Sequence, residues 1–140
     1  MKKTIHFTYQ QLPTIVAAYQ KELKKYDVIT VTGGLGAGKT TFIRQLMTLW
    51  GVDPMTVTSP TFTYLNTYDA HDGLVIYHFD LYRIGSLSEF KMLGFDEYLY
   101  QTDSKAILEW PEPVMSLLTH SVIHLSLEYG NQQDERTLIL

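Results

Sequence analysis

The 140-residue chain has no cysteine, which excludes disulfide bonds and thiolate metal sites. It is also short of positive charge: 11 Lys and Arg stand against 15 Asp and Glu, for a net charge of −4 at pH 7. Neutralising phosphates supplies most non-specific nucleic-acid binding, so this balance argues against a broad nucleic-acid surface. We therefore expect any link to nucleic acid to run through a partner protein.

Long hydrophobic runs are absent as well. None approaches the roughly 18 apolar residues of a membrane span, and residues 1–6 soon turn polar, so no signal peptide is predicted. We expect a cytoplasmic protein with no membrane contact. With 45% hydrophobic residues, the chain is long enough for one compact core and too short for two, so residues 1–140 are predicted to form a single domain.

Residues 33–40 match the phosphate-binding pattern G-x-x-x-x-G-K-[ST] at every fixed position. Glycines let the backbone turn tightly and point its N–H groups at phosphate oxygens. Lys39 adds a positive charge near the outer phosphates, and the Thr40 hydroxyl can complete the coordination of Mg²⁺. The residues predicted to bind the nucleotide here are Gly33, Leu35, Gly36, Ala37, Gly38, Lys39, Thr40 and Thr41.

The flanking sequence favours a real phosphate site over a glycine-rich turn that binds nothing. Residues 27–32 are rich in β-branched side chains, as in a buried parallel strand. A helix is predicted after the loop, ending at Gly51, so the phosphate would lie at a helix N-terminus. The predicted buried face of this helix comprises Phe42, Ile43, Leu46, Leu49 and Trp50.

The rest of the chain alternates between strand and helix patterns. We predict a strand over 4–8, a helix over 14–25, a hairpin from strands 62–68 and 74–81, a capped helix over 86–94, a strand over 105–110, and two final strands over 122–129 and 136–140. The inward side of the first helix is predicted to be Ile15, Val16, Ala18, Tyr19 and Leu23. Thr8, just before that helix, is either a plain cap or a nucleotide contact.

Two apolar strands end in a carboxylate, Asp80 and Glu109. An Asp in this place is also common in ordinary turns. However, P-loop proteins need acids at the carboxyl edge of the sheet, to hold Mg²⁺ and orient a water molecule. We therefore predict that Asp80 and Glu109 converge on one metal-centred site, outside the core. The hydroxyl-rich loop 58–63 is either a simple loop or a switch in which Thr61 senses the γ-phosphate.

Four motifs in order resemble the TsaE family, the small bacterial P-loop ATPases of tRNA threonylcarbamoyladenosine formation. They are LGAGKTT at 35–41, SPTF at 59–62, HFDLYR at 78–83 and EWPE at 109–112. The resemblance implies ATP as the nucleotide, Thr40 and Glu109 as magnesium ligands, Asp80 as the Walker B acid and loop 59–62 as the switch. It also implies that Arg136, placed just before the last strand, reaches the nucleotide. The family usually has an acid where this chain has Gly34, and the tail is shorter than usual.

This resemblance further implies partners. Such proteins work with TsaB and TsaD: TsaD transfers threonylcarbamoyl to adenosine 37 of tRNAs that read codons starting with adenine, and TsaE hydrolyses ATP so that the complex can turn over. TsaE itself would meet tRNA only through that complex.

The predicted fold is α/β: a P-loop NTPase-like three-layer sandwich with a mixed, mainly parallel central sheet and an antiparallel hairpin. Two other functions stay open. A small-molecule kinase would need a substrate pocket and an arginine-rich lid, and the chain has only three arginines. The other is a nucleotide-binding switch that hardly hydrolyses.

Overall fold

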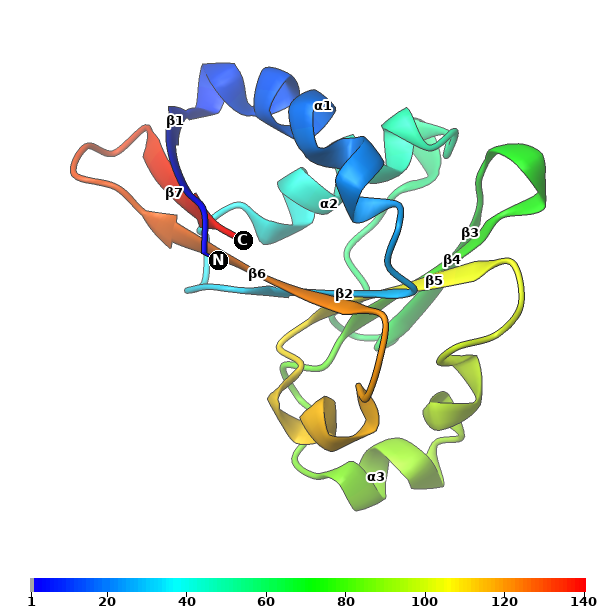
Figure 1. Ribbon diagram of the computed structural model, residues 1–140. Coiled ribbons are helices and arrows are strands. Elements are labelled where there is room, and N and C mark those ends of the chain that lie inside the picture. The colour runs from blue at the N-terminus through cyan, green and yellow to red at the C-terminus, as the bar shows by residue number, and fades with distance from the viewer. Residues whose placement is uncertain (1) are drawn as a thin grey trace.

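The computed structural model describes residues 2–140 and shows a seven-stranded sheet with helices on both faces (Figure 1). The strands are β1 (Thr4–Thr8), β2 (Val28–Thr32), β3 (Leu65–Asp69), β4 (Val75–Asp80), β5 (Ser104–Glu109), β6 (Val122–Tyr129) and β7 (Glu135–Ile139). They are arranged in the order β1-β7-β6-β2-β5-β4-β3. The four central strands are parallel, and β3 and β7 run against their neighbours, which confirms the predicted mixed, mainly parallel sheet.

Helices α1 (Leu12–Leu23) and α2 (Lys39–Leu49) lie on one face of the sheet, and α3 (Leu87–Met92) lies on the other (Figure 1). Short 3₁₀ turns at 95–98 and 112–117 complete the α3 layer. The predicted three-layer sandwich is therefore confirmed. Because both faces are covered, the central strand β2 is buried on both sides, and four of its five residues are buried, Thr30 among them.

Helix α1 begins at Leu12, two residues before the predicted start. Pro13 explains the difference, because proline is tolerated in the first helical turn, where its missing N–H would have no partner. The predicted inward position of Ala18 is wrong, since Ala18 is exposed. It lies two residues from the buried Val16, about 200° around the helix axis at 3.6 residues per turn.

The predicted burial of Leu49 is also wrong, because this residue is 46% exposed. It is the last residue of α2, and the following Trp50 fills the core instead, at 1% exposed. The other four residues of the predicted buried face, Phe42, Ile43, Leu46 and Trp50, are buried as expected.

The predicted hairpin forms, and the two predicted final strands also pair with each other. β3 pairs antiparallel with β4, and β6 pairs antiparallel with β7. β3 starts at Leu65, later than predicted, because Tyr64 has a positive φ of 66° and interrupts the extended backbone. Within residues 2–140, no helix has both the length and the apolar character needed to cross a bilayer.

Candidate functional site

The phosphate-binding loop, residues 33–38, leaves the carboxyl end of β2 and enters α2. Gly33 has a φ of 141°, and a Cβ added there would overlap the carbonyl oxygen of Leu127 on β6. No other residue type fits this position without moving β6. At Gly34, where the TsaE resemblance led us to expect an acid, an added Cβ would lie 3.5 Å from the Tyr129 ring, an ordinary contact. The site therefore tolerates a side chain at Gly34 but not at Gly33.

Lys39 is 6% exposed at the start of α2. Its Nζ donates to the carbonyl oxygens of Gly33 and Gly34, at 2.8 Å each, and lies 4.6 Å from the centre of the Trp110 ring. Burial lowers the pKa of the Lys39 ammonium below its ordinary value, and nearby carboxylates, Glu109 first, oppose that shift. The loop thus holds a cation at the point where outer phosphates would lie.

Asp80 and Glu109 are direct register partners on the parallel strands β4 and β5. Parallel neighbours deliver their carboxyl ends to one edge of a sheet, so the predicted convergence of these two positions is confirmed. Their expected placement outside the core is wrong: Asp80 is 7% exposed and Glu109 3%. Both sit on internal strands, β4 between β3 and β5 and β5 between β2 and β4, which accounts for their burial.

Two side chains contact the Glu109 carboxylate. The Thr40 hydroxyl donates to it at 3.2 Å from Oε1 and 3.3 Å from Oε2. His78 on β4 places its Nε2 2.7 Å from Oε2. The Glu109 carboxylate therefore links the first turn of α2, through Thr40, to strand β4, through His78.

The Asp80 carboxylate is bonded to a different segment, the hydroxyl-rich loop. Thr61 donates its hydroxyl to Oδ2 at 3.2 Å, and the backbone N–H of Tyr82 donates to Oδ1 at 3.0 Å. Ser59 lies 2.7 Å from the Thr61 hydroxyl. The loop predicted to be a switch thus touches the predicted Walker B acid, although its response to a nucleotide stays a prediction.

These groups border a hollow of about 340 Å³. Its lining is Tyr9, Leu35, Gly36, Gly38, Lys39, Thr40, Thr41, Ser59, Thr61, Asp80, Glu109 and Trp110. Among residues 2–140 there is no group of three or more His, Asp or Glu side chains placed to hold a metal ion. One hydroxyl and two carboxylates suit Mg²⁺ in a nucleotide site, because Mg²⁺ keeps several waters and takes further ligands from phosphates.

Arg136 lies in the last strand and not just before it as expected, and its predicted contact with the nucleotide stays a prediction. It lies within β7, is 6% exposed, and is absent from the lining of the hollow around Lys39. Its Nε donates to the carbonyl oxygen of Ala37 at 3.0 Å, and its guanidinium lies between the rings of Tyr9 and Tyr129, 4.4 and 4.7 Å from their centres. Arg136 therefore supports the phosphate-binding loop at the Ala37 carbonyl, from outside the hollow around Lys39.

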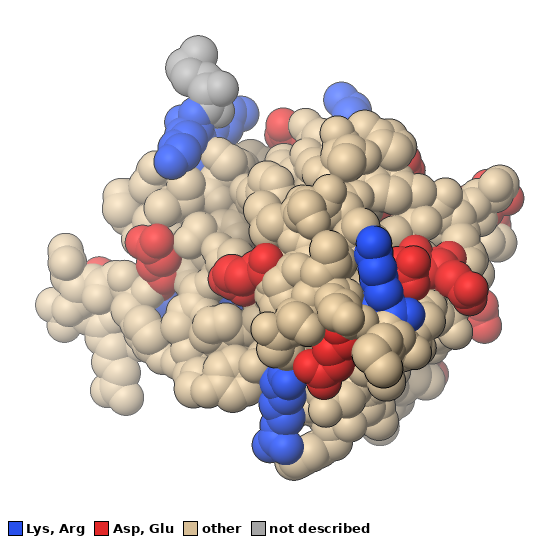
Figure 2. Space-filling model, turned by 90° about the horizontal axis from the view of Figure 1, so that it is seen from below, with Lys and Arg blue, Asp and Glu red and all other residues tan. Residues whose placement is uncertain are grey.

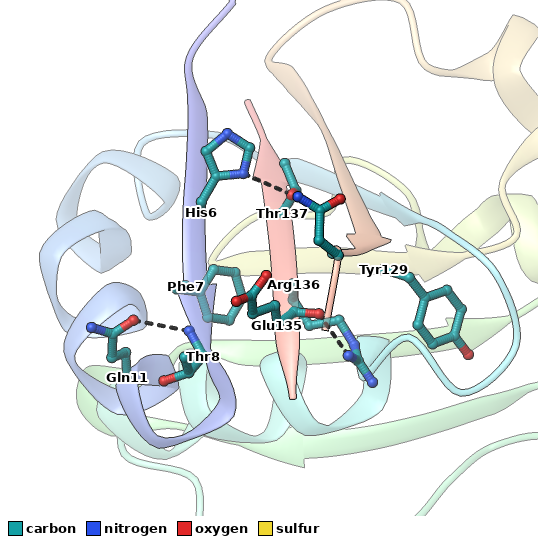
Figure 3. A pocket seen from close by; sticks show the side chains of 10 residues that line it. His6, Phe7, Thr8, Gln11, Tyr129, Glu135, Arg136 and Thr137 are labelled. Atoms are coloured by element: carbon teal, nitrogen blue, oxygen red, sulfur yellow. Dashed lines mark hydrogen bonds between the residues drawn. The ribbon is translucent and has the colours of Figure 1, made fainter. Parts of the chain in front are cut away.

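The other side of Arg136 borders a second hollow, of about 440 Å³, lined by β1, β7 and the turn after β6 (Figure 3). On its wall a hydrogen bond of 3.0 Å joins His6 on β1 to Thr137, its register partner on β7. Thr8 also lies on its wall and stands at the N-cap of the turn that precedes α1, with its backbone N–H donating to Gln11 at 2.9 Å. Of the two alternatives for Thr8, the structure thus shows the N-cap position, where the bond is made by the Gln11 side chain and not by the Thr8 hydroxyl.

Sequence reasoning missed four side chains around the phosphate-binding loop. Tyr9 and Tyr129 support it together with Arg136, Trp110 covers Lys39, and His78 holds Glu109. Only His78 left a signal, because a histidine inside an apolar strand needs a buried partner. The two tyrosines reach the loop from β6 and from the turn after β1, far away in sequence.

Residues 8–138 match the family described as "Threonylcarbamoyl adenosine biosynthesis protein TsaE". Among curated relatives, a Treponema pallidum tRNA threonylcarbamoyladenosine biosynthesis protein TsaE is 39% identical over 114 residues, which cover 79% of this chain and 82% of that protein. The Rickettsia conorii protein of the same name is 40% identical over 108 residues, 77% of this chain and 60% of its own length. This chain and the structure of Bacillus subtilis YdiB superpose with a TM-score of 0.64 at 27% identity, over 99% of this chain and 85% of that one.

The family match spans both the phosphate-binding loop and the strands that carry Asp80 and Glu109. The chain therefore belongs to the TsaE family of tRNA threonylcarbamoyladenosine biosynthesis.

Proposed function

We propose that the chain is an ATPase that binds ATP with Mg²⁺ and, together with TsaB and TsaD, supports formation of the threonylcarbamoyl group on adenosine 37 of tRNA. The observation that carries this proposal is the convergence of Thr40, Asp80 and Glu109 on the mouth of the phosphate-binding loop. A glycine-rich turn with no nucleotide role would not need two buried carboxylates beside its lysine.

Each residue has a task in this proposal. The N–H groups of residues 35–41 bind the phosphates, and Lys39 leaves the Gly33 and Gly34 carbonyls to contact the outer ones. Thr40 and Glu109 hold Mg²⁺, with Asp80 beside them. When bound, Mg²⁺ screens the charge that develops on the leaving phosphates.

Hydrolysis also needs a group that orients the attacking water. Asp80 and Glu109 are the candidates, because they are the two carboxylates that line the hollow and an ionised carboxylate accepts a hydrogen bond from water. Thr61, through its bond to Asp80, would link this step to the loop at 59–62. Arg136 acts in this proposal by holding the loop at Ala37.

The charge distribution supports a partner that handles the tRNA. The face that carries α3 shows acidic and basic side chains interspersed, with no broad basic patch (Figure 2). With a net charge of −4, the chain would contribute little phosphate neutralisation of its own. We propose that tRNA is held by the TsaB and TsaD complex and that the reaction takes place in the cytoplasm.

ATPase assays with and without purified TsaB and TsaD test the proposal. ADP should form from ATP and Mg²⁺ with no second acceptor present, and faster with the partners. ADP formation that requires a small-molecule acceptor would instead indicate a kinase. Nucleotide binding with no turnover, even with both partners, would indicate a switch.

A further inference from the structure

His78 is a buried imidazole in the middle of β4, with none of its surface exposed. Its Nε2 lies 2.7 Å from Oε2 of Glu109, and its Nδ1 has no hydrogen-bond partner in the described structure. A carboxylate can only accept, so Nε2 carries the proton and donates it. In a neutral ring, the unpaired Nδ1 is then the acceptor nitrogen.

This arrangement is poor if His78 serves only to fill the core. A buried polar atom without a partner costs free energy that an apolar side chain of similar size would avoid. The bond to Glu109 therefore has to explain why an imidazole is present. Its geometry suggests how, because it fixes Oε2 of a carboxylate that the Thr40 hydroxyl also contacts, at 3.2 Å from Oε1 and 3.3 Å from Oε2.

We propose that His78 is a positioning residue that holds the Glu109 carboxylate, through Oε2, in place at the cation site beside Thr40. This inference rests on the proposed Mg²⁺ and ATP function. A free glutamate side chain samples several rotamers, so a fixed one binds a cation with less loss of conformational entropy. Partners of this kind behind metal ligands typically contribute about 10- to 100-fold in metal affinity.

Three substitutions separate positioning from simple packing. His78→Gln can place its amide N–H near the position of Nε2, so it keeps the donor to Glu109. His78→Asn places its amide near the position of Nδ1, which is too far away. His78→Phe keeps a ring and removes the donor.

The measurement is equilibrium binding of a non-hydrolysable ATP analogue to the protein alone, titrated with Mg²⁺. His78→Phe and His78→Asn should raise the Mg²⁺ concentration for half-maximal effect by about tenfold or more, and His78→Gln by less than about threefold. Binding of the analogue without Mg²⁺ should stay within about twofold in all three. His124→Gln is a control for the loss of an imidazole hydrogen bond away from the site, because the exposed His124 on β6 bonds Thr30 at 2.7 Å. Its titration should match that of the wild-type protein.

If His78→Phe and His78→Asn show the same Mg²⁺ dependence of analogue binding as the wild-type protein, the proposal is overturned, whether or not their melting temperatures change. If His78→Phe does not fold, the proposal is tested by comparing the Mg²⁺ concentrations for half-maximal effect in His78→Gln and His78→Asn. A nitrogen NMR spectrum of the metal-free protein adds an independent readout: a His78 ring with unprotonated Nε2 would also overturn it. If analogue binding to the wild-type protein does not depend on Mg²⁺, the proposed function is contradicted. If the wild-type protein responds to Mg²⁺ and the His78 variants respond in the same way, only the His78 inference fails.

Discussion

The two faces of the sheet are built from the same strands but differ in chemistry. On β4, His78 and Asp80 alternate with Phe79, and β5 contributes Glu109 to the polar side. On the face covered by α3, Phe79 packs with Phe90 and Phe95, their ring centres 5.6 to 5.7 Å apart. The buried charged side chains of these strands thus lie on the face that carries α1 and α2, whereas the α3 side is packed mainly through apolar and aromatic side chains, with Thr30 and Ser104 as its buried polar residues.

The comparison predicts that substitutions on the α3 side affect stability and those at the start of α2 affect nucleotide chemistry. Four experiments test this difference between the two faces, in order of decreasing expected effect.

Phe90→Ala should lower the free energy of unfolding by about 3–5 kcal/mol, because it removes a fully buried ring and leaves a cavity between two others. Urea denaturation monitored by circular dichroism measures this loss. Nucleotide affinity should stay within about twofold while the protein is folded. Met92→Ala on the same helix is the control, because Met92 is 85% exposed and should change stability little. A large loss of affinity in folded Phe90→Ala would show that the two faces are not independent.

Lys39→Ala should reduce ATP turnover by about 100-fold or more, equivalent to roughly 2.7 kcal/mol of transition-state stabilisation, because it removes the charge aimed at the outer phosphates. Steady-state ADP formation with TsaB and TsaD present is the measurement. Stability should not fall, since the buried ammonium is lost together with its desolvation penalty. Lys91→Ala, an exposed lysine on α3, should leave turnover unchanged. If Lys39→Ala turns over ATP at the wild-type rate, residues 33–40 do not bind the phosphates as proposed.

Asp80→Asn and Glu109→Gln should each reduce hydrolysis by more than tenfold, above about 1.4 kcal/mol, because the shape is kept and the charge is lost. Melting temperatures should stay close to that of the wild-type protein, which would show that the charges serve the reaction and not the fold. Turnover at the wild-type rate in either variant would exclude that residue from the site.

The fourth experiment concerns Lys105, near the start of β5, at the edge of the sheet opposite the phosphate-binding loop. It is 7% exposed and donates to the carbonyl oxygen of Tyr26 at 2.7 Å, and burial lowers its pKa below the ordinary 10.5. Between the lowered pKa and 10.5 the unfolded chain binds more protons, so Lys105 makes stability rise with pH across that window. Lys105→Met should remove this rise and change the free energy of unfolding at pH 7 by no more than about 1 kcal/mol.

Urea denaturation of both proteins at several alkaline pH values checks the difference. If Lys105→Met and the wild-type protein show parallel pH dependence, the buried ammonium is not the source. Nucleotide turnover should be the same in both, because Lys105 does not line the hollow at the phosphate-binding loop.

Much of the fold followed from local sequence patterns. The β-branched run before Gly33, the two apolar strands that end in Asp80 and Glu109, and the turn residues between strands are all features that repeat at short range. The errors arose where a short-range pattern has two outcomes. Leu49 and Trp50 both fit the apolar side of α2, and only packing against the rest of the core selects Trp50.

The phosphate-binding loop, the strand and helix beside it and the two carboxylates at one sheet edge could be predicted from residue types at fixed spacing. The burial of Asp80 and Glu109, the bond from Arg136 to Ala37 and the bond between His78 and Glu109 could not, because they depend on the tertiary fold. Those three facts join residues up to 99 positions apart, and such contacts depend on strand order and on which face of the sheet each helix covers.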